Sequence, residues 1–231
     1  MKLPWLETLL AVLLSTASLV HGQQIPFSLQ TAEQPSEMPK ALGALLDPQG
    51  IRLMTTDNGL TKIACEVWFS KTVAGKPGAG NAGLQYTNLS VGALVGVLRF
   101  TEEGEDSRDQ KLKPGLYTLR YARVGTDPGT GQPADGVVLS PVSADTHVEQ
   151  AVPLEELTRI SRLASRTKNP AVMTLVPFNA AYKQFPAIVA DDQGNCILQI
   201  KLQVQAAGSP TIEPLPVAIL LITPEREDGE S

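Results

Sequence analysis

The sequence predicts a mainly β fold, namely a single β-sandwich with one packed α-helix. Short apolar runs alternate with turn residues along the whole chain, which contains 19 glycines and 18 prolines among 231 residues. Only the segment 153–166 repeats its apolar residues at helical spacing. Many short strands separated by turns are typical of all-β domains.

The N-terminal segment has the pattern of a secretory signal peptide. Lys2 supplies a positive charge, Leu9 to Val20 is almost entirely apolar, and Val20-His21-Gly22 forms a cleavage site. The apolar run is too short for a comfortable membrane span. We therefore expect residues 1–22 to be removed and the mature protein to be periplasmic or extracellular.

The first half of the mature chain predicts a lead-in followed by paired strands. Residues 23–39 are polar and carry two prolines, so we expect an extended or poorly ordered lead-in before a sandwich domain at 40–224. Asn58-Gly59 favours the tight turn of a hairpin. Strands are expected at 51–55, 60–70, 84–90 and 91–100, before a charged surface loop at 101–113.

The next strand, residues 116–124, follows a Pro114-Gly115 turn. Its Tyr117, Leu119 and Tyr121 share one face, which we expect in the core, while Thr118 and Arg120 share the other. Further strands are expected at 137–139 (a brief edge strand), 171–176, 187–190, 196–205 and 216–223, before an acidic tail at 225–231.

The one expected helix spans about residues 153–166. Proline suits its first turn, and the helix dipole favours Glu155 and Glu156 at its start and Arg162 and Arg166 at its end. An apolar stripe would face the sheet. Its members are Leu154, Leu157, Ile160, Leu163 and Ala164.

Cys65 and Cys196 are the only cysteines, and both lie on the apolar faces of expected strands. An even number of cysteines in an exported chain permits a disulfide, so we predict a Cys65–Cys196 bridge. The alternative is two separate buried thiols. The chain has no C-x-x-C spacing and little histidine, which argues against a redox or metal role.

Side chains that activate nucleophiles or hold metals are scarce. After signal cleavage His147 is the only histidine, and no nucleophile elbow or phosphate-binding loop is present. Asp145 lies two residues from His147, which is not triad geometry. We therefore predict no catalytic residue, no metal ligand and no cofactor.

Three arginines form the only candidate contact site. Arg159, Arg162 and Arg166 recur at i, i+3 and i+7, so they could contact an anion or a partner. The alternative is a solvated face paired with Glu155 and Glu156.

Two acidic groups are expected to be ordinary surface features. The charged loop carries Glu102, Glu103, Glu105, Asp106 and Asp109, and the last hairpin carries Asp191-Asp192. We expect a solvated loop and a turn, with a weak calcium site as the alternative.

The net charge limits the classes of binding partner that the protein is expected to have. A formal charge of −5 leaves no electrostatic footprint for nucleic acid, and no membrane span is expected once the signal peptide is removed. The expected partner is a protein or a small-molecule ligand.

The segment Leu112-Lys113-Pro114-Gly115-Leu116-Tyr117-Thr118-Leu119-Arg120-Tyr121 resembles the Pro-Gly-x-Tyr-x-Leu strand entry of exported bacterial β-sandwich modules, which include prealbumin-like and carboxypeptidase-regulatory-like domains. Residues 60–176 also resemble uncharacterised secreted bacterial proteins. The resemblance implies an immunoglobulin-like or prealbumin-like sandwich and carries no active-site residue to this chain.

Two functions agree with these observations. The first is an exported non-enzymatic binding or structural module of the bacterial periplasm or cell exterior. The alternative is a carboxylate-dependent hydrolase of a glycan or similar polymer, because glycosidases need only two carboxylates. A cleft that holds two carboxyl groups roughly 5 to 10 Å apart would favour the hydrolase.

Overall fold

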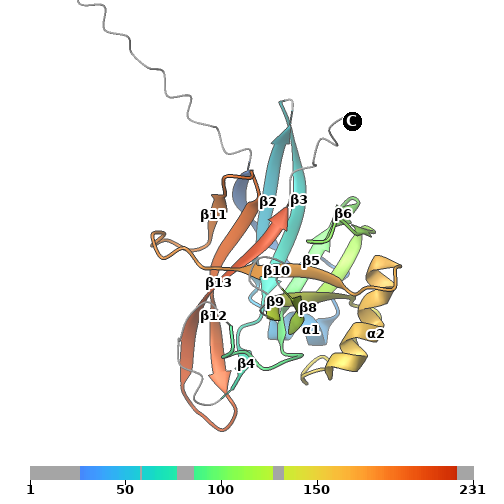
Figure 1. The fold of residues 1–231 in the computed structure, drawn as a ribbon, viewed down its shortest axis with the longest axis vertical. Coiled ribbons are helices and arrows are strands. Elements are labelled where there is room, and N and C mark those ends of the chain that lie inside the picture. Colours follow the sequence, from blue (N-terminus) through green and yellow to red (C-terminus); the bar gives the residue numbers. More distant parts are fainter. Residues whose placement is uncertain (1–26, 58, 77–85, 127–132, 223–231) are drawn as a thin grey trace, which may run out of the picture.

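Strands make up most of the protein in the computed structural model, which describes residues 27–57, 59–76, 86–126 and 133–222 (Figure 1). The helices are α1 (Lys40–Leu45) and α2 (Leu154–Ser165). The strands are β1 (Phe27–Glu33), β2 (Gln49–Asp57), β3 (Leu60–Phe69), β4 (Val73–Gly75), β5 (Leu94–Phe100), β6 (Gly104–Glu105), β7 (Lys111–Leu112), β8 (Gly115–Thr126), β9 (Pro133–Pro141), β10 (Ala171–Val176), β11 (Ala187–Ala190), β12 (Cys196–Ala206) and β13 (Ile212–Ile222).

Most strands belong to one curled sheet with the order β1-β2-β3-β5-β8-β9-β10-β13-β12-β11. All these neighbours are antiparallel, and β4 adds to β12 in parallel. Strand β10 pairs with β9 through residues 171–174 and with β13 through residues 175–176, so it joins the two halves of the sheet. The Tyr86 hydroxyl bonds to Val176 O (2.6 Å) and Ala218 N (3.2 Å) at this junction.

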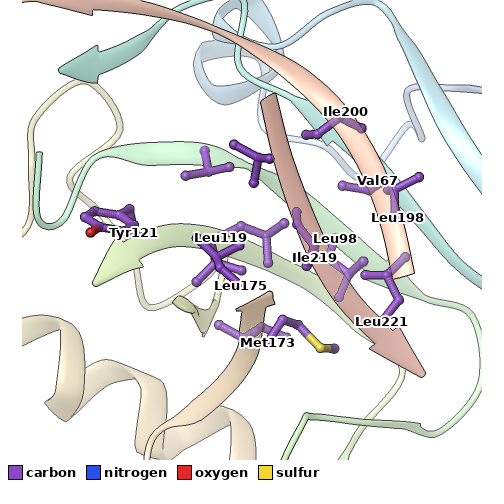
Figure 2. Close-up of a cluster of buried hydrophobic side chains, with 14 of the residues drawn as sticks. Val67, Leu98, Leu119, Tyr121, Met173, Leu175, Leu198, Ile200, Ile219 and Leu221 are labelled. Atoms are coloured by element: carbon purple, nitrogen blue, oxygen red, sulfur yellow. The ribbon is translucent and has the colours of Figure 1, made fainter. Parts of the chain in front are cut away.

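The main core lies inside the curl. Apolar side chains from both halves of the sheet meet there, including Val67, Leu98 and Leu119 from one half and Leu198 and Ile219 from the other (Figure 2). The predicted burial of Tyr117, Leu119 and Tyr121 in the core is confirmed, since each is at most 4 % exposed.

The two helices cover separate parts of the outer face. Leu42 of α1 packs with Trp68, which is fully buried. Leu157 and Ile160 of α2 pack with Val138 and Val172.

The predicted helix is confirmed within one residue at each end, with Pro153 as its N-cap and Arg166 as its C-cap. Two members of its predicted apolar stripe were placed wrongly. Leu154 and Leu163 are exposed, because they lie outside the buried face of α2, which consists of Leu157, Ile160, Ser161, Ala164 and Ser165.

Other elements also differ from the sequence analysis. Phe27–Glu33, assigned to the lead-in, is strand β1 of the sheet, and α1 was not expected. Strand β9 is nine residues long and lies between β8 and β10, so it is not a brief edge strand. Of the strand expected at 84–90, the described residues 86–90 contain only a bridge from Leu89 to Gly75. The predicted signal peptide and acidic tail lie outside the described residues.

Truncating Leu119 should destabilise the fold because this side chain is 1 % exposed in the centre of the core. Leu119→Ala is expected to lower the free energy of unfolding by about 2 to 5 kcal/mol, measured by urea titration of the mature protein. Leu163→Ala is the matched control, since Leu163 is 58 % exposed, and it should cost under about 0.5 kcal/mol. Equal effects of the two changes would contradict this placement of the core.

Candidate functional site

Strand β3 extends beyond its neighbour β5 and leaves one edge open. It begins at Leu60, but its pairing with β5 begins only at Glu66, which lies opposite Arg99 and forms an ion pair with it (3.2 Å). Within the described residues, no strand pairs with residues 60–65 on this side. At about 3.3 Å per residue, the open edge is about 20 Å long.

The register of the β2–β3 hairpin determines which backbone groups face the open edge. Asp57 and Leu60 flank a two-residue turn, so they form a hydrogen-bonded pair. Hydrogen-bonded and non-hydrogen-bonded pairs alternate along an antiparallel ladder, so Thr56–Thr61 and Met54–Ile63 are non-hydrogen-bonded pairs. Thr61 and Ile63 therefore direct their N–H and C=O groups away from β2. The hydroxyls of Thr56 and Thr61 lie 3.0 Å apart, which agrees with the close approach of a non-hydrogen-bonded pair.

A buried carboxylate holds the chain away from this edge after β5 ends. The Asp106 side chain accepts hydrogen bonds from the backbone N–H groups of Arg108 (2.8 Å), Gln110 (2.9 Å) and Val172 (2.9 Å), and from Gln110 Nε2 (2.7 Å). Ser107 adds two bonds of 2.8 Å to β10, at Val172 O and Thr174 N. The segment that carries β6 and β7 is therefore attached to β10 and, among the described residues, leaves positions 60–65 of β3 without a partner strand on this side.

Gly104 allows β6 to cross closely over the end of β5. A Cβ atom at this position would lie 2.3 Å from the Phe100 ring, so a larger residue would push the two apart.

A cavity of about 670 Å³ lies between the open edge of β3, the β6–β7 segment and the end of β13. Figure 1 shows these elements at the same end of the molecule. Apart from Asp106, its buried lining is apolar and consists of Cys65, Phe100 and Leu221. Its exposed lining is charged and includes Lys62 and Glu102. The site thus combines apolar surface, unpaired backbone and charge.

The rim of the cavity has an excess of free carboxylates. Glu105 forms an ion pair with Lys111. Glu102 and Glu103 are exposed, and no ion pair to either occurs among the described residues. Lys62 opposes them from β3. The predicted solvation of this acidic group is wrong for Asp106, because its carboxylate is buried and accepts four hydrogen bonds.

Cys65 and Cys196 are free thiols in the core, and they do not lie at disulfide distance. The structure therefore differs from the predicted bridge and agrees with the alternative of two buried thiols. The two residues come from β3 and β12, which are not neighbours in the sheet, so no strand pairing brings them within the Cα separation of at most about 7 Å that a disulfide spans.

Burial makes both thiols unreactive. It raises the pKa of Cys65, with smaller contributions from Cys196 and Glu66, and it raises the pKa of Cys196 to about 12. Thiols with raised pKa values stay protonated at neutral pH and are poor nucleophiles and poor metal ligands. Among the described residues, no cluster of three or more His, Cys, Asp or Glu side chains could hold a metal ion.

The three arginines of α2 are only partly brought together. Arg159 binds Glu156 through two hydrogen bonds of 2.6 and 2.7 Å, and this contact lowers the pKa of Glu156. Arg159 and Arg162 border a surface cavity of about 470 Å³ that also contains Glu155 and Glu156, whereas Arg166 is not part of its lining. The local charge is therefore mixed, and an anion or partner contact here stays a prediction.

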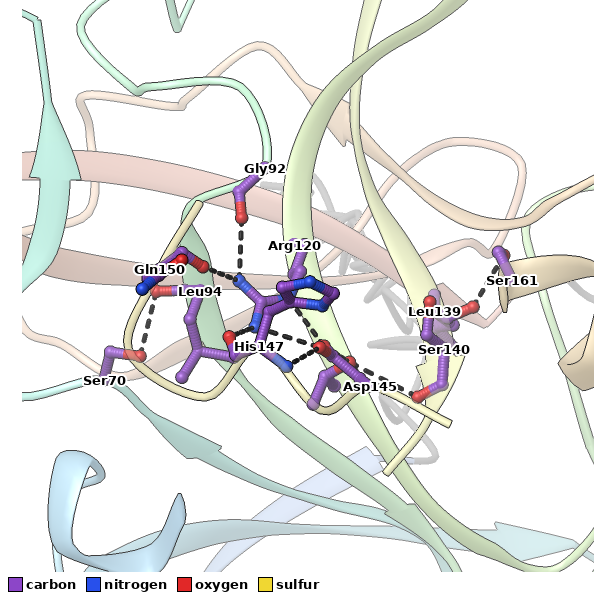
Figure 3. A network of polar contacts seen from close by, with 11 residues as sticks. Ser70, Gly92, Leu94, Arg120, Leu139, Ser140, Asp145, His147, Gln150 and Ser161 are labelled. Carbon is purple, nitrogen blue, oxygen red and sulfur yellow. Dashed lines mark hydrogen bonds and ion pairs between the residues drawn. The ribbon is translucent and has the colours of Figure 1, made fainter. Parts of the chain in front are cut away.

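The most deeply buried charged pair is structural. Arg120 and Asp145 are fully buried and joined at 2.5 Å, and Arg120 also donates to the carbonyl oxygens of Gly92 (2.8 Å), Gln150 (2.9 Å) and His147 (Figure 3). These bonds anchor the segment 141–152 to the outer face of β8. The alternating pattern of β8 placed Arg120 in a polar layer, but nothing in the sequence identified Asp145 as its partner.

His147 does not form a catalytic triad with Asp145. Both carboxylate oxygens of Asp145 are occupied, by Arg120, by the Thr118 hydroxyl (2.7 Å) and by the backbone N–H of His147 (3.2 Å). The ring Nδ1 of His147 is buried and has no hydrogen-bond partner in the described part of the chain. This geometry offers no route for proton transfer between the two side chains.

Comparison of the chain with protein-family models, with curated proteins and with solved structures found no match. In the described ranges, no helix is long and apolar enough to cross a membrane.

Thiol titration tests the state of the cysteines. The denatured, unreduced mature protein should contain two titratable thiols, because Cys65 and Cys196 are the only cysteines and both are free. The native protein should react slowly, since both thiols are buried. A denatured, unreduced sample without titratable thiols would contradict the structure and support the predicted Cys65–Cys196 disulfide.

Proposed function

We propose that this protein is an exported, non-enzymatic binding module of the periplasm or cell exterior, and that its ligand occupies the cavity beside β3. The single observation that carries the proposal is the combination of an apolar floor, an open strand edge and a charged rim around about 670 Å³. Ligand sites typically pair a mostly apolar concave surface with a few convergent polar groups. Export rests on the signal-peptide pattern of residues 1–22.

The scaffold suits a binding module. We regard it as a sandwich-like arrangement, because the two halves of the curled sheet face each other across one core. The resemblance to exported bacterial β-sandwich modules supports the same class. The β6–β7 segment, which contributes the acidic rim of the site, is attached to β10 by Asp106 and Ser107, so the sheet holds this loop in place.

A hydrolase is the second candidate, because several carboxylates line the same cavity. The environment of each carboxylate argues against it. Asp106 is occupied by four donors, Glu105 is paired with Lys111, and Glu102 and Glu103 are exposed. A glycosidase needs a general acid that apolar surroundings keep protonated. None of these side chains has such surroundings, so binding is the better-supported function.

Filling the cavity should remove ligand binding. We expect the neutral dye Nile red to bind the mature protein saturably, and Ala64→Phe to weaken this binding at least roughly tenfold, or about 1.4 kcal/mol, in a fluorescence titration. Ala74→Phe is the matched control, since Ala74 lines a separate cavity of about 370 Å³. An absence of saturable binding, or equal affinity of the two variants, would overturn the proposal.

A further inference from the structure

We infer that the ligand of this cavity is an extended peptide with basic side chains, which binds by adding a strand to the open edge of β3. This inference rests on the proposed function and names the ligand class of the same site.

The backbone of β3 is open to strand addition along one edge. Thr61 and Ile63 present N–H and C=O groups that no described strand pairs, beside a cavity large enough to admit a chain. Main-chain hydrogen bonds to such an edge are the basis of peptide recognition by strand addition. An added strand would lie in line with β5 and, like β5, antiparallel to β3.

The lining of the cavity indicates which side chains such a peptide would carry. Side chains alternate between the two faces of a strand, so one set of peptide side chains would face the floor formed by Cys65, Phe100 and Leu221. This set should be apolar. The free carboxylates of Glu102 and Glu103 stand on the rim, so basic side chains should fill the alternate positions.

The remaining edges of the sheet are less suitable. Strands β1 and β11 end the sheet, and they contact each other. A second copy of the chain at β3 would bring two acidic rims together, which like-charge repulsion opposes. These observations favour a basic peptide over self-association.

The experiment measures binding of a fluorescein-labelled hexapeptide of alternating lysine and valine by fluorescence anisotropy. The control peptide has the same sequence with every amide N-methylated, which removes backbone donors and keeps the charge. We expect the control to bind at least roughly tenfold more weakly. Because N-methylation leaves the protein unchanged, this comparison does not depend on the folding of any variant.

Two pairs of protein variants test the two parts of the site. Thr61→Pro removes one outward N–H and should weaken peptide binding about fivefold, the effect of one lost hydrogen bond, whereas Thr61→Val should not. Glu102→Gln/Glu103→Gln should weaken binding and reduce its salt dependence. Glu149→Gln/Glu155→Gln is its matched control, because both residues are exposed and lie outside this cavity.

Equal affinity for the two peptides would overturn strand addition, as would equal affinity of the Thr61→Pro and Thr61→Val variants. If Nile red still binds in the cavity, the proposed function stands and only the peptide inference fails. A dimer in sedimentation analysis that Thr61→Pro dissociates would assign the edge to a second copy and would also overturn the inference.

Discussion

The hydrogen bonds of the Asp106 carboxylate determine the shape of the proposed site. They hold the segment after β5 against Val172 of β10. If this segment instead continued in line with β5, it would pair with residues 60–65 of β3 and close the edge. A buried carboxylate is costly unless donors surround it, and here four donors do so. The polar group that stabilises the loop is therefore also the one that keeps the edge of β3 open.

The rest of the fold makes the site rigid. The curled sheet encloses the main core, α1 covers Trp68 on the outer face of β3, and the Arg120–Asp145 pair anchors the segment 141–152 beside β8. Buried ion pairs stabilise a fold little by themselves, but loss of one partner is strongly destabilising, so this pair favours a single arrangement of that segment. The two thiols are buried and protonated, so they supply no nucleophile to the proposed site.

Local patterns in the sequence predicted most strands and the helix α2. The alternation in β8 identified the core face of Leu119, and Asn58-Gly59 located the β2–β3 hairpin. Long-range features escaped prediction. Nothing local shows that residues 60–65 of β3 extend beyond β5, or that Asp106 bonds to Val172. Nothing local shows that Cys65 and Cys196 lie on strands that are not neighbours in the sheet. These features depend on which distant segments meet after folding, so the site could be identified only from the structure.

The open edge of β3 is tested most directly by amide hydrogen exchange of the free mature protein. We expect alternating protection, because Lys62 N–H bonds to β2 and Trp68 N–H bonds to β5, whereas no strand in the described part of the chain pairs with Thr61 or Ile63 on their side. Lys62 and Trp68 should exchange slowly, and Thr61 and Ile63 should exchange near the rate of an unstructured peptide. Equal protection of Thr61, Lys62 and Ile63 would show that another segment covers this edge, and would contradict the claim that the edge of β3 is open.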